Sequence, residues 1–246
     1  MLEVATRRLM RLHLTEFDAT EVYGIYGSSK DALATRMRFL HPAAAKSFRA
    51  MSADSRVRCS DMLRTPEGSL SNRRRKGKGL RPGWSGHNYG FSIDIVVGWM
   101  LKTHGINKME LDQWMASHGW YCHNIPGETR SYEAWHYNYF GEEAEHYLSF
   151  REDSSKRTWS SPISQKIEEY YGHWWQRTDI VSVQRALKNL KFYEGGLDVY
   201  ATSPTKTALR SFQKEWDLAV DGIAGPNTLR TLMLVSAEKV LVDEVC

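Results

Sequence analysis

The chain has 246 residues, of which 41% are hydrophobic and 25% charged, and its formal net charge is +4. This composition excludes collagen, low-complexity fibres and disordered chains, and the length allows one large domain or two modest ones. The charge favours an anionic partner. Three cysteines without a CxxC pair predict free thiols. No apolar run is long enough for a transmembrane helix, and residues 1–17 lack the apolar core of a secretory signal.

The first half of the chain predicts alternating helices and strands. Apolar residues at helical spacing predict a helix over residues 30–52, which Pro42 interrupts. A strand is expected over residues 56–63. Residues 65–83, rich in glycine, serine and basic residues, predict a loop. The apolar stretch FSIDIVV predicts a buried strand over residues 91–97.

Residues 108–118 predict a further helix, and residues 123–131 predict a loop. The polar, serine-rich stretch REDSSKRTWSSP begins a linker, in which ISQKIEEYYGHWWQR adds a short helix. Beyond it, apolar spacing predicts three helices, the third beginning at Pro226. About 60 residues can form a small independent core. We therefore expect three parts, over residues 1–150, 151–178 and 179–246.

Two clusters of residues carry the chemical signal: SGHNYGFSID at residues 85–94 and EAWH at residues 133–136. A catalytic zinc site takes three ligands from histidine and carboxylate groups and leaves one position open. His87, Asp94 and His136 would supply these ligands. Glu133 would remain beside the metal as a general base. Asp94 lies within an apolar run, where burying an uncompensated carboxylate is costly and a metal ion would satisfy it.

Residue types alone leave other interpretations open. A histidine beside a glycine is more often a hydrogen-bonded loop residue than a ligand, and Trp135 fits a core position better than a substrate platform. His104, His118 and His123 are alternative ligands. None of these three has a glutamate three residues before it, whereas His136 does.

The two clusters together resemble a known family. SGHNYGFSID resembles the SxHxxGxAxD motif of the VanY-type D-alanyl-D-alanine carboxypeptidases and L-alanyl-D-glutamate endopeptidases, and EAWH resembles their ExWH. Ser92 stands where the family usually has alanine. The resemblance covers roughly residues 30–148. It implies an α+β fold, in which a small antiparallel sheet with flanking helices binds one zinc ion.

The resemblance also implies roles for single residues. His87, Asp94 and His136 would be the zinc ligands, and Glu133 the catalytic base. The family has an arginine before the first motif that holds a substrate carboxylate or the developing oxyanion. Arg64 matches it best, with Arg58 as the alternative. Substrate-binding roles are implied for three residues: Ser85, Arg64 and Trp135.

The C-terminal part has a resemblance of its own. VQRALKNLKFYEGGLD and KTALRSFQKEWDLAVDGIAGPNTLRTL resemble the common three-helix peptidoglycan-binding domain. Its most recognisable elements are the Phe212-Gln213 pair and the DGxxGPxT pattern of residues 221–228. LDVYATSPT replaces the glycine-containing turn that is usual in the family. The resemblance implies bacterial peptidoglycan as the partner.

Three functions remain open. The first is a phage-type endolysin that cleaves the L-Ala–D-Glu bond of the stem peptide, a monomer made in the host cytoplasm and acting on the wall after release. The second is a D-Ala-D-Ala carboxypeptidase, and the third a non-catalytic wall-binding or virion protein. The basic run over residues 72–78 fits a solvated loop or one that steers acidic wall polymers. No nucleic-acid-binding fold accompanies it, so no nucleic acid is expected as a partner.

Overall fold

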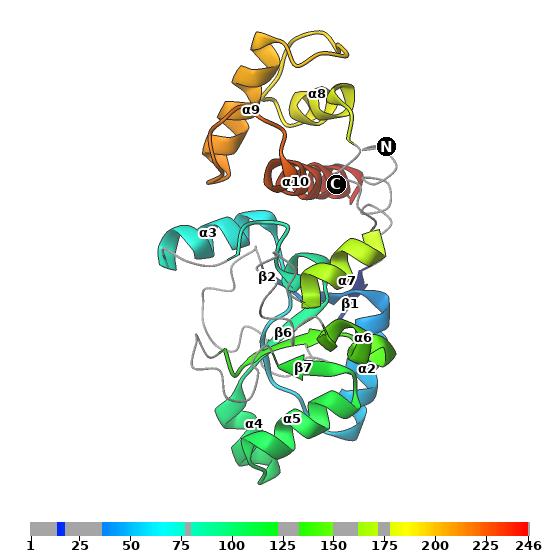
Figure 1. The fold of residues 1–246 in the computed structure, drawn as a ribbon. Coiled ribbons are helices and arrows are strands. Elements are labelled where there is room, and N and C mark those ends of the chain that lie inside the picture. The colour runs from blue at the N-terminus through cyan, green and yellow to red at the C-terminus, as the bar shows by residue number, and fades with distance from the viewer. Residues whose placement is uncertain are drawn as a thin grey trace. The chain divides into compact units, whose positions relative to one another are not determined.

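The computed structural model describes residues 14–17, 36–76, 80–122, 133–149, 162–171 and 178–245. Within them the chain forms two compact units (Figure 1). The sheet unit comprises His13–Thr65 and Ser85–Ile167, and the helical unit comprises Pro66–Trp84 and Glu168–Cys246. The chain thus enters the helical unit once over Pro66–Trp84 before it returns to the sheet unit, and the boundaries expected at residues 150 and 178 stay predictions.

A four-stranded antiparallel sheet lies in the sheet unit, with the strand order β4-β6-β8-β7 (Figure 1). In that order the strands are Cys59–Asp61, Ser92–Ile95, His136–Tyr139 and Trp120–Cys122. Two short antiparallel pairs accompany the sheet: β1 (Thr15–Glu16) with β3 (Phe39–Leu40), and β2 (Arg36–Met37) with β5 (Leu63–Arg64). The expected α+β fold with a small antiparallel sheet is confirmed.

The core of the sheet unit joins the sheet to its helices. Side chains alternate between the two faces of a strand, so Ile93 and Ile95 of β6 point into the core while Asp94 does not. Helix α2 (Pro42–Asp54) adds Phe48 and Met51, and helix α5 (Lys108–Ser117) adds further buried apolar residues. The remaining elements are α4 (Val97–His104), η2 (Gly141–Glu143) and α6 (Ala144–Ser149).

The helix predicted over residues 30–52 is wrong in its first part, because residues 36–40 form β2 and β3. Helix α2 begins at Pro42. Proline has no backbone N–H, but N–H groups in the first turn of a helix have no carbonyl partner within the helix, so proline is well tolerated there. His41 caps it, as its Nδ1 accepts a hydrogen bond from the N–H of Ala43 at 3.4 Å. Met37 and Leu40 belong to strands of two residues, a pattern too short to distinguish from a helical one, and residues 30–35 lie outside the described part of the chain.

The loop predicted over residues 65–83 is also wrong, because Pro66–Lys76 forms helix α3. Pro66 occupies the favoured first position, and Glu67 complements the positive end of the helix dipole. The helix has no apolar stripe, so periodicity gave no signal for it. The basic run expected in a loop therefore lies largely within this helix.

The helical unit contains the three predicted helices, which are confirmed: α8 (Ile180–Asn189), α9 (Ser203–Glu215) and α10 (Pro226–Val245). Their apolar faces form its core, with Leu187, Leu209, Phe212, Leu232 and Met233 buried. Helix α7 (Pro162–Tyr171) precedes them and confirms the short helix expected in the segment ISQKIEEYYGHWWQR, of which residues 172–177 lie outside the described part of the chain. No helix in the described ranges is both long and apolar enough to cross a membrane.

Candidate metal centre

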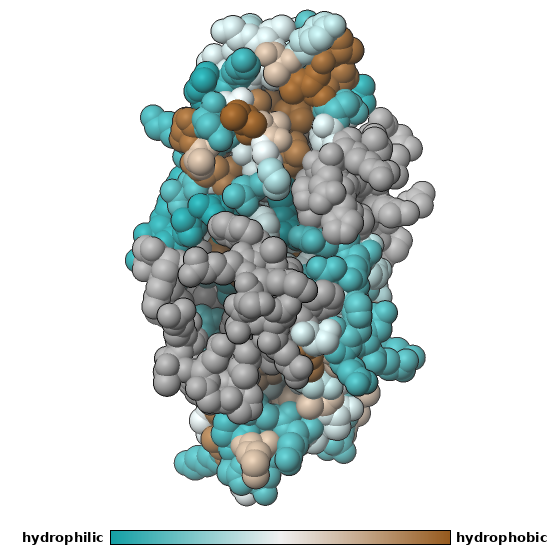
Figure 2. Space-filling model, viewed as in Figure 1, coloured by the Kyte–Doolittle hydropathy of each residue, from teal (hydrophilic) through white to brown (hydrophobic). Residues whose placement is uncertain are grey.

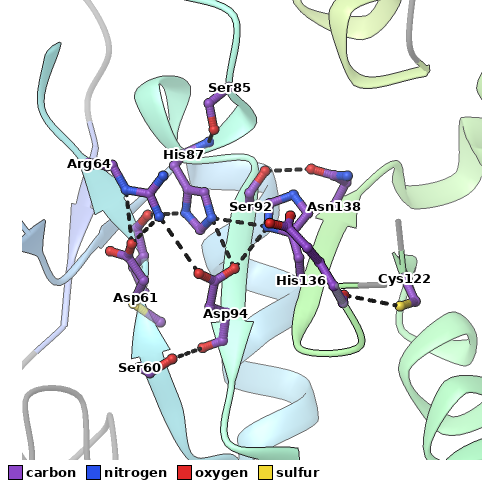
Figure 3. A network of polar contacts seen from close by, with 12 residues as sticks. Ser60, Asp61, Arg64, Ser85, His87, Ser92, Asp94, Cys122, His136 and Asn138 are labelled. Carbon is purple, nitrogen blue, oxygen red and sulfur yellow. Dashed lines mark hydrogen bonds and ion pairs between the residues drawn. The ribbon is translucent and has the colours of Figure 1, made fainter. Parts of the chain in front are cut away.

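Three side chains converge at the junction of β6 and β8. His87 lies on the short helix η1 (Gly86–Tyr89), Asp94 on β6 and His136 opposite Asp94 on β8. The Nε2 atom of His87 lies 3.1 Å from Asp94 Oδ1 and 3.1 Å from His136 Nδ1, and the last two atoms are 2.8 Å apart. Figure 3 shows the three side chains pointing toward one another. The residues predicted as metal ligands from the sequence are thus brought together.

The backbone around His87 fixes which of its nitrogens faces this point. Its Nδ1 lies 2.6 Å from the carbonyl oxygen of Met62, which can only accept a hydrogen bond. Nδ1 therefore carries a proton, and Nε2 is the ring nitrogen that faces Asp94 and His136. Two ring nitrogens and one carboxylate oxygen thus meet at one point, and this group could hold a metal ion. The described residues contain one such group of histidine, cysteine and acidic side chains.

The charge state of Asp94 suits this role. Burial acts to raise its pKa, but the charge of His87 and hydrogen bonds with both histidines outweigh burial and hold the pKa well below its usual range. Asp94 is therefore a carboxylate at neutral pH, which is the form that binds a metal ion.

Arg64 lies beside the three ligands. Its Nε donates to Asp61 Oδ2 at 3.0 Å, its Nη2 bonds the same oxygen, and Nη2 lies 3.7 Å from Asp94 Oδ2 (Figure 3). The Arg64 side chain is 16% exposed and that of Asp61 is 2% exposed. Asp61 thus fixes the guanidinium next to the centre. Arg58, the alternative, lies with its guanidinium over the ring of Trp99 instead.

The other predicted site residues surround the ligands. The Ser85 hydroxyl caps η1 by accepting a hydrogen bond from the N–H of His87 at 3.3 Å, and Ser85 is buried. Glu133 is exposed on the turn before β8, and its carbonyl accepts a hydrogen bond from the N–H of His136 at 3.0 Å. Trp135 is 43% exposed on the same turn.

A buried hydrogen bond lies next to the centre, between the Ser92 hydroxyl and Oδ1 of Asn138, at 2.5 Å on facing strands. Both side chains are fully shielded from solvent. Gly86 lies against this pair, because a Cβ placed on it would be 2.1 Å from Ser92 Oγ. Gly90 adopts a φ of +71°, and a Cβ there would be 2.5 Å from the backbone nitrogen of His41. Both glycines thus allow close packing behind the ligands.

Sequence reasoning missed several residues that support the site. Asp61 lies on β4 in register with Asp94, and an acidic residue inside a predicted strand was the available signal. Asn138 follows His136 by two residues on β8 and gave no signal of its own. The Met62 carbonyl is a backbone group, which no residue pattern can reveal. Each of these groups positions a neighbour rather than completing the ligand set.

The alternative histidines have other surroundings. His104 has Ser55 Oγ at 3.0 Å from one ring nitrogen and the carbonyl of Arg56 at 2.8 Å from the other. His118 ends helix α5, and its Nε2 lies 3.9 Å from Asp54. His123 lies outside the described residues. The metal-ligand prediction therefore stays with His87, Asp94 and His136.

In the helical unit, the turn before α10 is built around Gln213, whose side chain is fully buried. Its Nε2 donates to Asp221 Oδ1 at 2.7 Å, to the carbonyl of Ile223 at 2.9 Å and lies 3.1 Å from Thr228 Oγ1. Its Oε1 accepts from the N–H of Gly222 at 2.8 Å. One glutamine thus satisfies the polar groups of the DGxxGPxT segment, which explains why these two sequence elements occur together.

Comparison with known proteins identifies the C-terminal part of the chain. Residues 176–232 match the model of a peptidoglycan binding domain family. The C-terminal region carries a peptidoglycan-binding domain. The chain is also 44% identical over 59 residues to a protein of Mycobacterium tuberculosis named N-acetylmuramoyl-L-alanine amidase CwlM. This alignment covers 24% of the chain and spans 14% of the length of that relative.

Proposed function

We propose that the chain is a zinc-dependent peptidoglycan hydrolase of the endolysin type, which cleaves the stem peptide between L-Ala and D-Glu. The observation that carries the proposal is the convergence of His87, Asp94 and His136 within one chain that also carries a peptidoglycan-binding domain. The name of the mycobacterial relative supports wall hydrolysis in general. The choice of bond rests on the resemblance of the two motifs to the endopeptidase family.

The geometry supports zinc as the metal. Zinc bonds to histidine nitrogen and carboxylate oxygen are roughly 2.0–2.2 Å long, so two ligands of a tetrahedron lie about 3.3 Å apart. The three ligand atoms here are separated by 2.8–3.1 Å, close to that value. Two histidines and one carboxylate with an open fourth position are typical of a hydrolytic zinc site. When bound, zinc lowers the pKa of a coordinated water to about 7 and polarises a carbonyl oxygen.

Residues of the chain supply the remaining functions in this proposal. Glu133 removes a proton from the attacking water and passes it to the departing amine nitrogen. The guanidinium of Arg64, held by Asp61 beside the centre, binds a substrate carboxylate or the developing oxyanion. Ser85 keeps His87 in position through the cap of η1. Because its hydroxyl is buried, Ser85 contributes to substrate binding in this proposal by positioning His87. The exposed Trp135 offers an aromatic surface to the substrate.

The peptidoglycan-binding domain contributes through local concentration. A catalytic site tethered to a wall-binding domain meets its substrate at an effective concentration far above that in free solution. Weak binding of a single stem peptide at the active centre is therefore sufficient for turnover on the wall.

Mass spectrometry of purified peptidoglycan after digestion, with and without a chelator, tests the proposal. New amino termini on D-Glu, lost with the chelator and restored by zinc, are the expected result. Release of D-Ala alone would show a carboxypeptidase instead. New amino termini on L-Ala, freed from the lactyl group of the sugar, would show an amidase. If the protein binds peptidoglycan but cleaves no bond in it, the chain would instead be a non-catalytic wall-binding protein. Arg64→Ala should lower the rate of cleavage, because the guanidinium beside the centre is lost, whereas Arg58→Ala, outside the centre, should not.

A further inference from the structure

The helical unit contains a concavity of about 470 Å³ between α9 and the segment that follows α8. One wall is a row of hydroxyl side chains on α9, with Ser203, Thr207 and Ser211 at four-residue intervals on one helix face. The other wall is the segment of residues 191–195, which includes a cationic and an anionic side chain, Lys191 and Glu194. A small cavity thus offers both charges and several hydrogen-bonding groups, a combination that suits a zwitterionic ligand.

Lys191 has an unusual backbone. Its φ of +66° lies in the left-handed region, at the C-terminal end of α8 where glycine is the usual residue. The N–H groups of Lys191 and Phe192 close the helix on the carbonyls of Lys188 at 3.1 Å and Leu187 at 2.8 Å. A residue with a Cβ is strained in this conformation, and such strain is concentrated at functional sites. Lys191 lines the cavity, so contact with a ligand there would account for a lysine at this position.

The chain that joins the two walls of the cavity, residues 196–202, is held in place by a buried glutamine. Gln184 accepts a hydrogen bond from the N–H of Asp198 at 2.6 Å and donates one to the carbonyl of Tyr200 at 3.2 Å. This fixed segment exposes large apolar side chains: Val199 is 68% exposed and Tyr200 73%. Figure 2 shows hydrophobic surface over the connection between α8 and α9. The segment therefore presents apolar surface beside the charged cavity without needing to be ordered on binding.

We propose that this α8–α9 cavity binds the stem peptide of peptidoglycan rather than its glycan strand. Lys191 pairs with a stem carboxylate, Glu194 with the free ammonium of the diamino acid, and the hydroxyl row with the peptide amides. The glycan strand, built of neutral N-acetylated sugars, offers no charged group that could pair with Lys191 or Glu194. The proposal deepens the wall-binding part of the proposed function and does not depend on its zinc chemistry.

Titration of the full chain followed by backbone amide NMR tests the proposal, with Glu133→Gln present to prevent turnover. The probes are a synthetic stem tripeptide ending in a diamino acid and, separately, a chitin tetrasaccharide. We expect the tripeptide to shift amides over residues 191–211 at millimolar concentration or below, and the tetrasaccharide to leave them unchanged. Shifts from the tetrasaccharide alone, or from neither probe, would overturn the assignment.

Lys191→Gly separates binding from folding. Glycine tolerates the left-handed backbone, so this variant should melt at a higher temperature than the parent while binding the tripeptide at least about tenfold more weakly. Lys206→Ala, an exposed lysine of α9 outside the cavity, should bind within about twofold of the parent. Unchanged tripeptide binding by Lys191→Gly would refute the role of its ammonium. Cleavage of whole peptidoglycan is scored separately, so loss of the zinc hypothesis would leave this test intact.

Discussion

Gly86 has no room for a side chain, and its replacement tests the packing behind the metal centre. A methyl group at this position would lie 2.1 Å from Ser92 Oγ, 2.8 Å from a side-chain carbon of Ile163 and 3.1 Å from Asn138 Oδ1. Overpacking of this kind costs about 1–3 kcal/mol. Displacing Ser92 also breaks its buried hydrogen bond with Asn138, which adds about 1–3 kcal/mol. Gly86→Ala should therefore lower the free energy of unfolding by about 2–6 kcal/mol.

A double-mutant cycle assigns that loss to its cause. Ser92→Ala alone should cost about 1–3 kcal/mol, because Asn138 loses its buried partner. The same change removes the atom nearest to the new methyl group, so the double variant should be less destabilised than the sum of the single variants. We expect a coupling energy of about 1–2 kcal/mol, measured by urea unfolding.

The matched control is Gly98→Ala. Gly98 lies within helix α4, and a Cβ there would meet nothing within 4 Å. Alanine is the better helix former, so this variant should be more stable by roughly 0.5–1 kcal/mol. Additivity of Gly86→Ala and Ser92→Ala within about 0.5 kcal/mol would refute the proposed clash.

Further variants test the site and its surroundings. Glu133→Gln should abolish cleavage of peptidoglycan while zinc binding, measured by metal titration, persists; retained cleavage would contradict its role as base. His136→Ala should lose zinc and, with it, the rise in melting temperature that zinc gives the parent protein. Burial, assisted by the charge of Lys166, lowers the pKa of His41 from 6.5 to about 4, so the unfolded chain takes up a proton first as the pH falls. The contribution of His41 to the free energy of unfolding is thus fully present above pH 6.5 and should decline by up to about 3 kcal/mol as the pH falls to 4. His41→Asn keeps a side chain that can cap the helix but does not titrate, so this variant should show a smaller decline. Urea titrations at each pH measure the difference. Lys166→Met should lower the free energy of unfolding by about 1–3 kcal/mol, since the carbonyl of Phe140 loses a donor at 3.0 Å. It should also make the loss of stability between pH 6.5 and pH 4 smaller, and an unchanged pH profile would exclude an effect of the Lys166 charge on the pKa of His41.

The group His87, Asp94 and His136, which could hold a metal ion, could be predicted from the sequence because its signal is local. Asp94 stands out as a carboxylate in an apolar strand, and His87 and His136 each lie in a short pattern with a neighbouring glycine or glutamate. The strand alternation that places Asp94 opposite Ile93 and Ile95 was also predictable, since it depends only on the geometry of a strand. The three helices of the C-terminal part followed from their apolar spacing for the same reason.

Features that depend on distant parts of the chain could not be predicted. Helix α3 has a polar sequence, and its contacts come from residues more than 130 positions away, such as Asp217, which Arg73 bonds at 2.7 Å. Asp61 acquires its function only when the strand pairing brings it beside Asp94 and Arg64. The Met62 carbonyl selects the His87 tautomer, yet any residue type at position 62 would supply the same group. Tertiary contacts, rather than local preference, decide all three.

The path of the chain through the two units limits how this protein can be shortened. Residues 66–84 belong to the helical unit, where the Thr231 hydroxyl donates to the carbonyl of Pro82 at 3.0 Å and Arg230 lies 4.1 Å from the ring centre of Trp84. This excursion leaves directly after Thr65 and returns directly before Ser85. A truncation at the linker would therefore remove the partners of a segment that is joined to Arg64 at one end and to Ser85 and His87 at the other. Replacing the helical unit as a whole would need two cuts in the chain rather than one.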